Sequence, residues 1–274
     1  MGHAGKPHIP EKPEKEYDMD IRRRTASPFG LSAFSLKLLA AVTMVVDHIG
    51  AYLLPNVIFL RIIGRLSFPL FAFFIAEGCR YTRNRLRRFL LVLGLALVCE
   101  AGYLAVSREL TGTALLTFSC SIPIIYALQV FKHALVRPGT AVRRAMSILL
   151  SVAALAGAIA LGYAVSVCVP IDYGFPGVLL PVMASLPDYR EGEAPACLKQ
   201  ADRHPLRLGL FAIALLAVWY FRGHTDLQLY SLLALIPLAL YNGRPGPRRF
   251  KYWFYLFYPA HLAVIWLIGA LLQG

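Results

Sequence analysis

The chain has 274 residues, of which 58% are hydrophobic and only 16% are charged. With a mean hydropathy of +0.59, it is too apolar to be a soluble globular protein of this length. Apolar runs of about 18 residues or more recur along it, and each is long enough to cross a hydrocarbon core of about 30 Å as a helix. The composition predicts an all-α, polytopic integral membrane protein.

The amino-terminal residues differ from the rest in composition. Residues 1–32 mix Lys, Glu, Pro and Gly and contain the basic cluster Arg22, Arg23 and Arg24. Such a stretch cannot bury enough apolar surface to order itself, and its hydrophilic length does not resemble a cleavable signal peptide. We expect residues 1–32 to form a disordered, basic cytoplasmic tail and residues 33–274 to form one helical membrane domain.

The apolar pattern predicts a bundle of about eight or nine transmembrane helices. The sixth segment is too short to cross straight, so it is either a re-entrant segment or part of the Pro-rich turn before it, and whether it crosses is left open. The predicted segments are 34–54, 57–76, 89–106, 113–131, 145–169, 175–186, 206–221, 227–241 and 252–271.

Basic residues predict the orientation, because Lys and Arg accumulate in short loops on the cytoplasmic side. They cluster before the first segment and after the second, fourth, sixth and eighth, whereas the alternate loops hold only Arg108 and Arg222. The amino terminus is therefore expected inside and, with nine crossings, the carboxyl terminus outside. The same loops explain the formal net charge of +13; no nucleic-acid recognition module accompanies it, so no nucleic-acid partner is expected.

The cysteines indicate no metal site. The chain has 5 cysteines, scattered and never in a C-x-x-C pair. This pattern is typical of small apolar side chains inside membrane helices, so we assign them neither metal nor disulfide chemistry.

Ionisable side chains inside the apolar segments are the strongest functional signal. Asp47 and His48 lie within the first segment, where each costs a few kcal/mol even on the mildest insertion scales. At about 1.5 Å of rise per residue, Arg65 and Glu100 fall within about one helical turn of the same depth, and His261 falls near the midplane. The shared layer predicts chemistry or transport inside the bilayer.

Arg61 and Arg65 are four residues apart and share a helix face, where their charges repel. Burying both requires anions, and the hairpin through Pro55 brings Asp47 to their level. We expect a network of the arginines with Asp47 and Glu100, whose spare positive charge can hold an anionic substrate or a developing oxyanion. The alternative is a purely structural network that ties three helices together.

Sequence strings in five places carry a family resemblance. They are LKLLAAVTMVVDHIG at 36–50, RIIGRLSFPLFAFFIAEGCRYTRN at 61–84, DYGFPGVLL at 172–180, LYNGRPG at 240–246 and KYWFYLFYPAHL at 251–262. Together they resemble the TraX family, whose namesake acetylates the amino terminus of conjugative pilin. The resemblance extends from about Leu36 to the carboxyl end and is weaker through 113–169 and 188–205.

The resemblance implies a multi-pass acyltransferase of the bacterial inner membrane, surrounded by membrane lipid. It would use acetyl-CoA as a co-substrate, with a pilin, another peptide or a glycan as the acceptor. The family's signature positions correspond here to Asp47, His48, Arg61, Arg65, Glu77, Asn242, Tyr258, Pro259 and His261, and Glu100 matches a recurrent acidic position.

Chemistry suggests a role for each of these residues. His48, supported by the carboxylate of Asp47 or Glu100, could remove a proton from an amine or hydroxyl acceptor, or His48 or His261 could itself carry the acetyl group. The expected substrate-binding residues are Arg61, Arg65, Glu77 and Tyr258, and those expected to contact the phosphates of acetyl-CoA are Arg80, Arg83, Asn242, Arg244 and Lys251. The alternative functions are a proton-coupled transporter and a non-catalytic membrane assembly factor.

Overall fold

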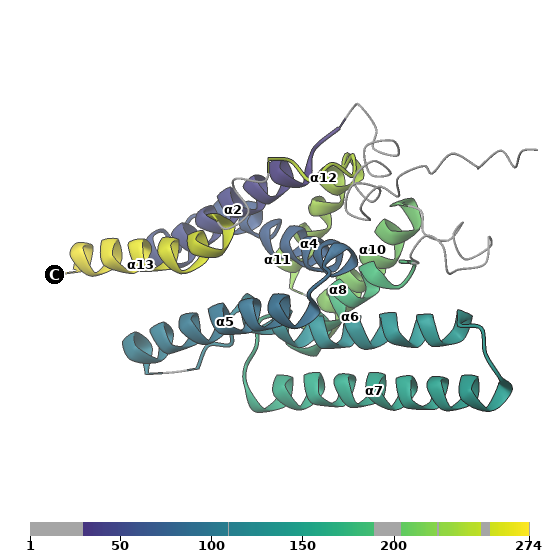
Figure 1. The fold of residues 1–274 in the computed structure, drawn as a ribbon. Helices are drawn as coiled ribbons and strands as arrows, with labels where there is room; N and C mark the ends of the chain where they lie inside the picture. The colour runs from purple at the N-terminus through teal and green to yellow at the C-terminus, as the bar shows by residue number, and fades with distance from the viewer. Residues whose placement is uncertain (1–29, 109, 189–203, 224, 248–252, 274) are drawn as a thin grey trace, which may run out of the picture.

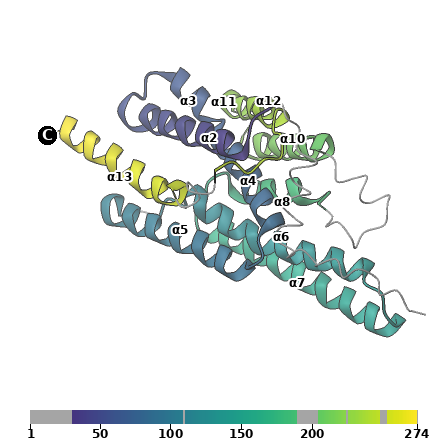
Figure 2. The ribbon, with the colours of Figure 1, turned by 45° about the horizontal axis from the view of Figure 1, so that its top comes forward.

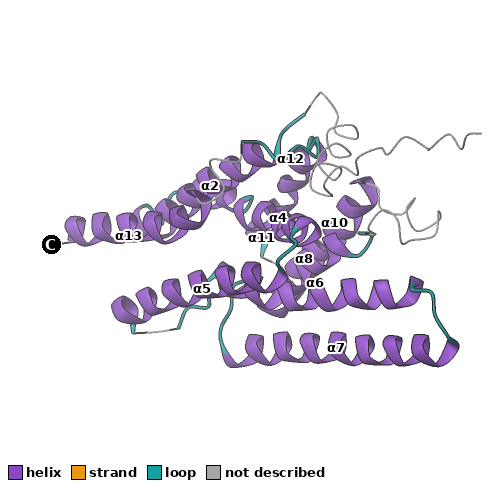
Figure 3. Ribbon diagram, in the orientation of Figure 1, coloured by secondary structure: helices purple, strands orange, loops and turns teal. Residues whose placement is uncertain are grey.

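The computed structural model describes residues 30–108, 110–188, 204–223, 225–247 and 253–273. Within these ranges the chain consists of helices joined by loops (Figure 3). One isolated β-bridge joins Leu31 and Tyr241. Lys251 and residues 1–29 of the expected tail lie outside the described residues.

The helices follow the apolar segments closely. In chain order they are α2 (Ala33–His48), the π-helical turn η1 (Ile49–Leu53), α3 (Ile58–Gly64), α4 (Ser67–Tyr81), α5 (Arg85–Ser107), α6 (Ala114–Val136), α7 (Ala141–Cys168), α8 (Gly174–Ser185), α10 (His204–Phe221), α11 (Asp226–Leu229), the 3₁₀ turn η2 (Tyr230–Ala234), α12 (Leu235–Ala239) and α13 (Trp253–Gln273).

Among the described residues, 6 helical stretches are long and apolar enough to cross a membrane. The chain is therefore a multi-pass membrane protein. The other apolar helices are shorter: Gly174–Ser185, Asp226–Ala239 and Leu256–Gly269. The sixth expected segment is indeed short, and the full number of crossings and their direction stay predictions.

Helix α4 is the centre of the packing. It contacts α2, α6 and α8, and its Phe73 is fully buried. The ring of Phe73 meets Phe74, Phe211 and Tyr241 edge-on, with centroids 5.8 to 6.0 Å apart. Edge-on aromatic pairs add attraction beyond the burial of their area, so this cluster fixes α4 against α10 and the segment that follows α12.

Other helices keep apolar faces exposed. Helix α7 lies alongside α6 (Figure 1). Only 11% of its most apolar 18-residue stretch is nevertheless buried, and Leu149, Leu161 and Val167 are exposed. In a bilayer such faces meet lipid tails, which are as apolar as leucine. The outward faces of α7 are therefore compatible with lipid contact.

The first and last helices meet beside a break in the first hairpin. Helix α2 ends at His48 and continues as the π-helical turn η1, and π-turns occur frequently at functional sites. The second arm of this helical hairpin is also interrupted, because α3 ends and α4 begins around Arg65 and Leu66. Helix α13 lies between α2 and α5 (Figure 2) and contacts both, together with η1.

Candidate active site

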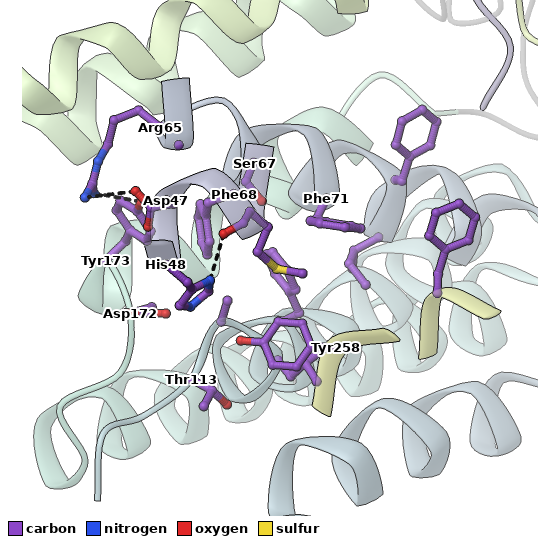
Figure 4. A pocket seen from close by; sticks show the side chains of 18 of the residues that line it. Asp47, His48, Arg65, Ser67, Phe68, Phe71, Thr113, Asp172, Tyr173 and Tyr258 are labelled. Atoms are coloured by element: carbon purple, nitrogen blue, oxygen red, sulfur yellow. Dashed lines mark hydrogen bonds and ion pairs between the residues drawn. The ribbon is translucent and has the colours of Figure 1, made fainter. Parts of the chain in front are cut away.

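A cavity of about 890 Å³ is bounded chiefly by α2, α4, α5 and the loop before α8. One end, here called the Lys37 end, is lined by Phe34, Lys37, Phe74, Arg88, Gly246 and Phe254. The opposite end, called the Tyr52 end, is lined by Tyr52, Tyr103, Asp172, Arg222 and Thr225. Lys37 and Tyr52 are fifteen residues apart, so the cavity follows about 22 Å of helix. Asp47 and His48 line it (Figure 4), and they precede Tyr52 by only five and four residues.

Asp47 joins the two arginines of α3. Its carboxylate lies 3.0 Å from Nη1 of Arg61 and 3.8 Å from Nη2 of Arg65, and Nη1 of Arg61 also donates to the Asp47 carbonyl at 3.1 Å. Gly64 makes this approach possible, because a Cβ there would overlap the carboxylate. The expected pairing of Asp47 with both arginines is confirmed.

Arg65 also reaches the loop before α8. Its Nη1 donates to the hydroxyl of Tyr173 at 3.1 Å, and its buried Nε has no hydrogen-bond partner among the described residues. Burial raises the pKa of Tyr173 to about 12, so the phenol stays protonated. Tyr173 has a left-handed backbone, φ 61°, a conformation that costs a non-glycine residue about 1–3 kcal/mol and clusters at functional sites.

His48 and His261 form a hydrogen-bonded pair. Nδ1 of His48 lies 2.8 Å from the Met44 carbonyl and 3.3 Å from Nε2 of His261, whose own Nδ1 lies 3.0 Å from the Phe257 carbonyl. Carbonyl oxygens only accept, so both Nδ1 atoms carry the hydrogen, and Nε2 of His261 accepts. The lone pair of neutral His48 is then on its Nε2, which has no hydrogen-bond partner among the described residues.

Only one of these histidines lines the cavity. His48 does, with its ring stacked on Tyr52 at a centroid distance of 6.0 Å, whereas the ring of His261 lies behind it on α13 and is 7% exposed. The side chain that supports His48 is therefore another histidine rather than a carboxylate.

Glu100 has a different role from the one expected. It is 6% exposed, and its two oxygens accept hydrogen bonds from the backbone N–H groups of Gly112, at 3.1 Å, and Thr113. The Gly112 carbonyl in turn accepts the N–H of Asp172 at 2.7 Å. Glu100 thus holds the loop before α6 and, through it, the loop before α8. It does not line the cavity beside His48, so its expected place in the arginine network is wrong.

Asp172 is the additional carboxylate in the cavity. Its side chain is accessible to water, and no hydrogen bond or ion pair of the carboxylate is found within the described part of the chain. Protein atoms nevertheless surround it on most sides, and this desolvation raises the pKa of Asp172 to about 6, against the opposing influence of Arg222 and Arg65.

Comparison with known proteins assigns the family. The TraX protein family matches residues 32–269. The chain belongs to the TraX family. It is 26% identical over 245 residues to "Probable fimbrial assembly protein FimC, serogroup H1" of Dichelobacter nodosus, which covers 85% of this chain and 94% of that protein. It is also 54% identical to "Uncharacterized protein RP591" of Rickettsia prowazekii (strain Madrid E) over 39 residues, which make up 14% of this chain and 16% of that protein. No solved structure matches significantly.

The positions taken from the TraX resemblance divide into two groups. Asp47, His48, Arg61, Arg65 and Tyr258 line the cavity, and His261 lies directly behind it. Glu77 does not line it. The Glu77 carboxylate is 2.9 Å from Nη1 of Arg207 and accepts the Tyr241 hydroxyl at 3.1 Å, so its expected role in substrate binding is replaced by a buried ion pair.

The arginines expected to contact acetyl-CoA, Arg80, Arg83 and Arg244, do not line the cavity. Nε of Arg80 is 3.2 Å from the buried Asp188 carboxylate, and Arg83 and Arg244 are exposed. The Asn242 side chain donates to the Gly30 carbonyl and accepts the N–H of Arg244, which shapes its own loop. In this TraX protein the cavity wall comes instead from the next residues of that loop, Pro245–Pro247.

Sequence reasoning missed several residues of the cavity, among them Lys37, Asp172 and Tyr173. The string DYGFPGVLL was available as a signal for the last two, since a carboxylate and a tyrosine stand beside a glycine before an apolar helix. Arg88 stands at the end of the basic run 80–88 that was expected to meet the phosphates of acetyl-CoA, whereas no property of Lys37 distinguished it from an ordinary residue near a helix end.

Proposed function

We propose that this TraX protein is an acyltransferase of the bacterial inner membrane that moves an acetyl group from acetyl-CoA to an amine or hydroxyl acceptor. Family membership supports the reaction class. The observation that carries the proposal is Nε2 of His48, which has no hydrogen-bond partner among the described residues and belongs to a cavity that follows most of the length of a membrane helix.

His48 acts as the general base in this proposal. Its Nε2 takes the proton of the acceptor N–H or O–H while the acceptor atom bonds to the carbonyl carbon of the thioester. The carbon–sulfur bond then breaks, and His48 returns the proton to the departing thiolate, which leaves as the thiol of CoA. His261 and the Met44 carbonyl keep the Nδ1 hydrogen in place, so that the lone pair of neutral His48 is on Nε2 before and after each proton transfer.

Arg65 stabilises the negative charge that develops on the carbonyl oxygen. Its Nη1 donates to Tyr173 and its Nη2 lies 3.8 Å from the Asp47 carboxylate. These contacts orient the guanidinium, whose Nε–H has no hydrogen-bond partner among the described residues. A fixed donor at a developing oxyanion is worth about 10²- to 10³-fold in kcat. Arg61 meanwhile neutralises Asp47, so that Asp47 positions the guanidinium of Arg65 without repelling the oxyanion.

The two ends of the cavity would serve the two substrates. The basic-loop pattern places the Lys37 end at the cytoplasm, where acetyl-CoA is available, and the Tyr52 end outside. An acceptor outside the cytoplasm agrees with the relative that is named as a fimbrial assembly protein. Acetylated pilin or another surface peptide fits this arrangement, and a surface glycan is the alternative acceptor.

The test is acetyl transfer by the full-length protein in liposomes. Radiolabelled acetyl-CoA is supplied on one side, and peptides with a free amino terminus or simple glycans on the other. We expect label in the acceptor with the wild type, and a loss of at least about 100-fold in His48→Ala. His133→Ala, at the exposed end of α6, is the matched control.

Two results would contradict the proposal. One is wild-type protein that binds acetyl-CoA and consumes none with any acceptor. The other is full transfer by His48→Ala, which would remove the base from the mechanism. Proton-driven uptake of a solute by the same liposomes would favour the transporter alternative.

A further inference from the structure

We infer that the Lys37 end of the cavity binds the diphosphate of CoA, with Lys37 and Arg88 as the two cations that hold it. This inference rests on the proposed function, because it names the site of the acyl donor. It differs from the sequence expectation in naming Lys37, and the described members of the expected set, Arg80, Arg83, Asn242 and Arg244, do not line the cavity.

The two cations lie at one depth on two helices that both line the cavity. The hydroxyls of Tyr52 and Tyr103 are 3.3 Å apart, so they join the hairpin and α5 at a common level. Helices α2 and α5 run in the same direction (Figure 1). Lys37 precedes Tyr52 by fifteen residues and Arg88 precedes Tyr103 by fifteen, so both cations lie about 22 Å from the tyrosine pair.

The distance from the cations to the base matches the arm of CoA. Lys37 is eleven residues before His48 within the regular helix α2, a rise of about 16 Å. The pantetheine arm has about 13 bonds between its sulfur and the first phosphorus, and an extended chain advances about 1.2 Å per bond. A thioester held at His48 therefore brings the diphosphate to the level of Lys37 and Arg88.

The surroundings of Arg88 favour an anion from outside the chain. Its Nη2 donates to the Ile75 carbonyl at 3.4 Å, and the guanidinium lies so close to Gly78 that a Cβ there would overlap it. Within the described residues no carboxylate pairs with Arg88, and its buried Nε has no hydrogen-bond partner. A guanidinium fixed in this way with free donors suits a phosphate.

Apolar walls beside the cations suit the rest of the ligand. Nζ of Lys37 lies 5.3 Å from the centroid of the Phe74 ring. The rings of Phe34 and Phe254 meet edge-on at 5.9 Å, and Gly246 packs on Phe34 so closely that a Cβ would overlap it. Apolar surfaces with a few fixed polar groups are typical of ligand pockets, and CoA carries both an apolar arm and a charged head.

The experiment compares two thioesters in the full-length protein. Acetyl-CoA carries the diphosphate, and acetyl-pantetheine has the same arm without it. We expect Lys37→Gln and Arg88→Gln each to raise the KM for acetyl-CoA about 10- to 150-fold, because each removes a charge-assisted contact. Their KM for acetyl-pantetheine and their kcat should stay at the wild-type value. Arg87→Gln is the matched control, since this neighbour is exposed and does not line the cavity.

Equilibrium binding of CoA to the purified variants gives a readout that needs no turnover. The site is supported if both glutamine variants bind CoA more weakly than the wild type and if Lys37→Arg, which keeps the charge at position 37, binds it normally. This result would support the site even if the wild type transfers no acetyl group. A lack of transfer would refute only the proposed function. The inference is overturned if both variants bind CoA as the wild type does. It is also overturned if they lose acetyl-CoA and acetyl-pantetheine turnover equally, because the residues would then act on the fold.

Discussion

The histidine pair offers the sharpest test of the mechanism, because its two members should respond unequally to truncation. His48→Ala removes the base and should lower kcat by about 10²- to 10⁴-fold. His261→Ala removes one acceptor of a hydrogen that is shared with the Met44 carbonyl at 2.8 Å. The loss is one net hydrogen bond of about 0.5–1.5 kcal/mol, or roughly 2- to 13-fold.

The assay is acetyl transfer in liposomes at saturating acetyl-CoA, with melting temperature and CoA binding measured on each variant. His48→Gln is the informative companion, since an amide can hydrogen-bond but cannot take up the proton, and it should be nearly as inactive as alanine. If His261→Ala loses 100-fold or more while His48→Ala stays active, the base is on α13, and the assignment of the lone pair to His48 is wrong.

Three further predictions concern the side chains around the base. Gly64→Ala should lower the free energy of unfolding by about 1–3 kcal/mol, because its Cβ overlaps the Asp47 carboxylate; Gly157→Ala, which has open space, is the control, and equal stability of the two would contradict the packing argument. Arg65→Lys should keep the fold yet lower kcat about 10²- to 10³-fold, since an ammonium cannot reproduce the fixed fork; full turnover would assign Arg65 to packing. Burial raises the pKa of Asp172 to about 6 from 3.8, so the folded state holds this proton more tightly than the unfolded state. The wild type should therefore lose stability relative to Asp172→Asn as the pH rises from about 4 to above 6, and a pH-independent difference in melting temperature would refute the shift.

The sequence predicted well how deep the ionisable side chains lie in the membrane, but it predicted poorly toward which neighbouring segment each side chain points. Rise per residue placed Asp47, Arg61 and Arg65 at one level, and the repulsion of two arginines on one face required an anion, so their pairing followed. Glu100 was expected at nearly the same depth, and it contacts the loop before α6 instead. Depth is one coordinate of three, and the rotation of a helix about its axis depends on neighbours that a single sequence does not identify.

The same limit applies to the two histidines. His48 and His261 are more than two hundred residues apart in sequence, and their depths suggested only a common layer. Their contact depends on α13 lying against α2 and η1, which follows from the packing of the whole bundle. By contrast, the apolar helices of the first five segments were predictable, because a run of about 20 apolar residues has few other stable states in a bilayer.

The breaks in these helices were the least predictable part of the fold, and they give an independent reason to regard the cavity as functional. A hydropathy window averages over about 19 residues and treats each segment as one straight helix. In the structure, α2 passes into a π-turn directly after His48, and α3 is separated from α4 at Arg65. Tyr173, which binds Arg65, has a left-handed backbone. Departures from regular helix tend to persist where function requires them, and these three meet around a single cavity.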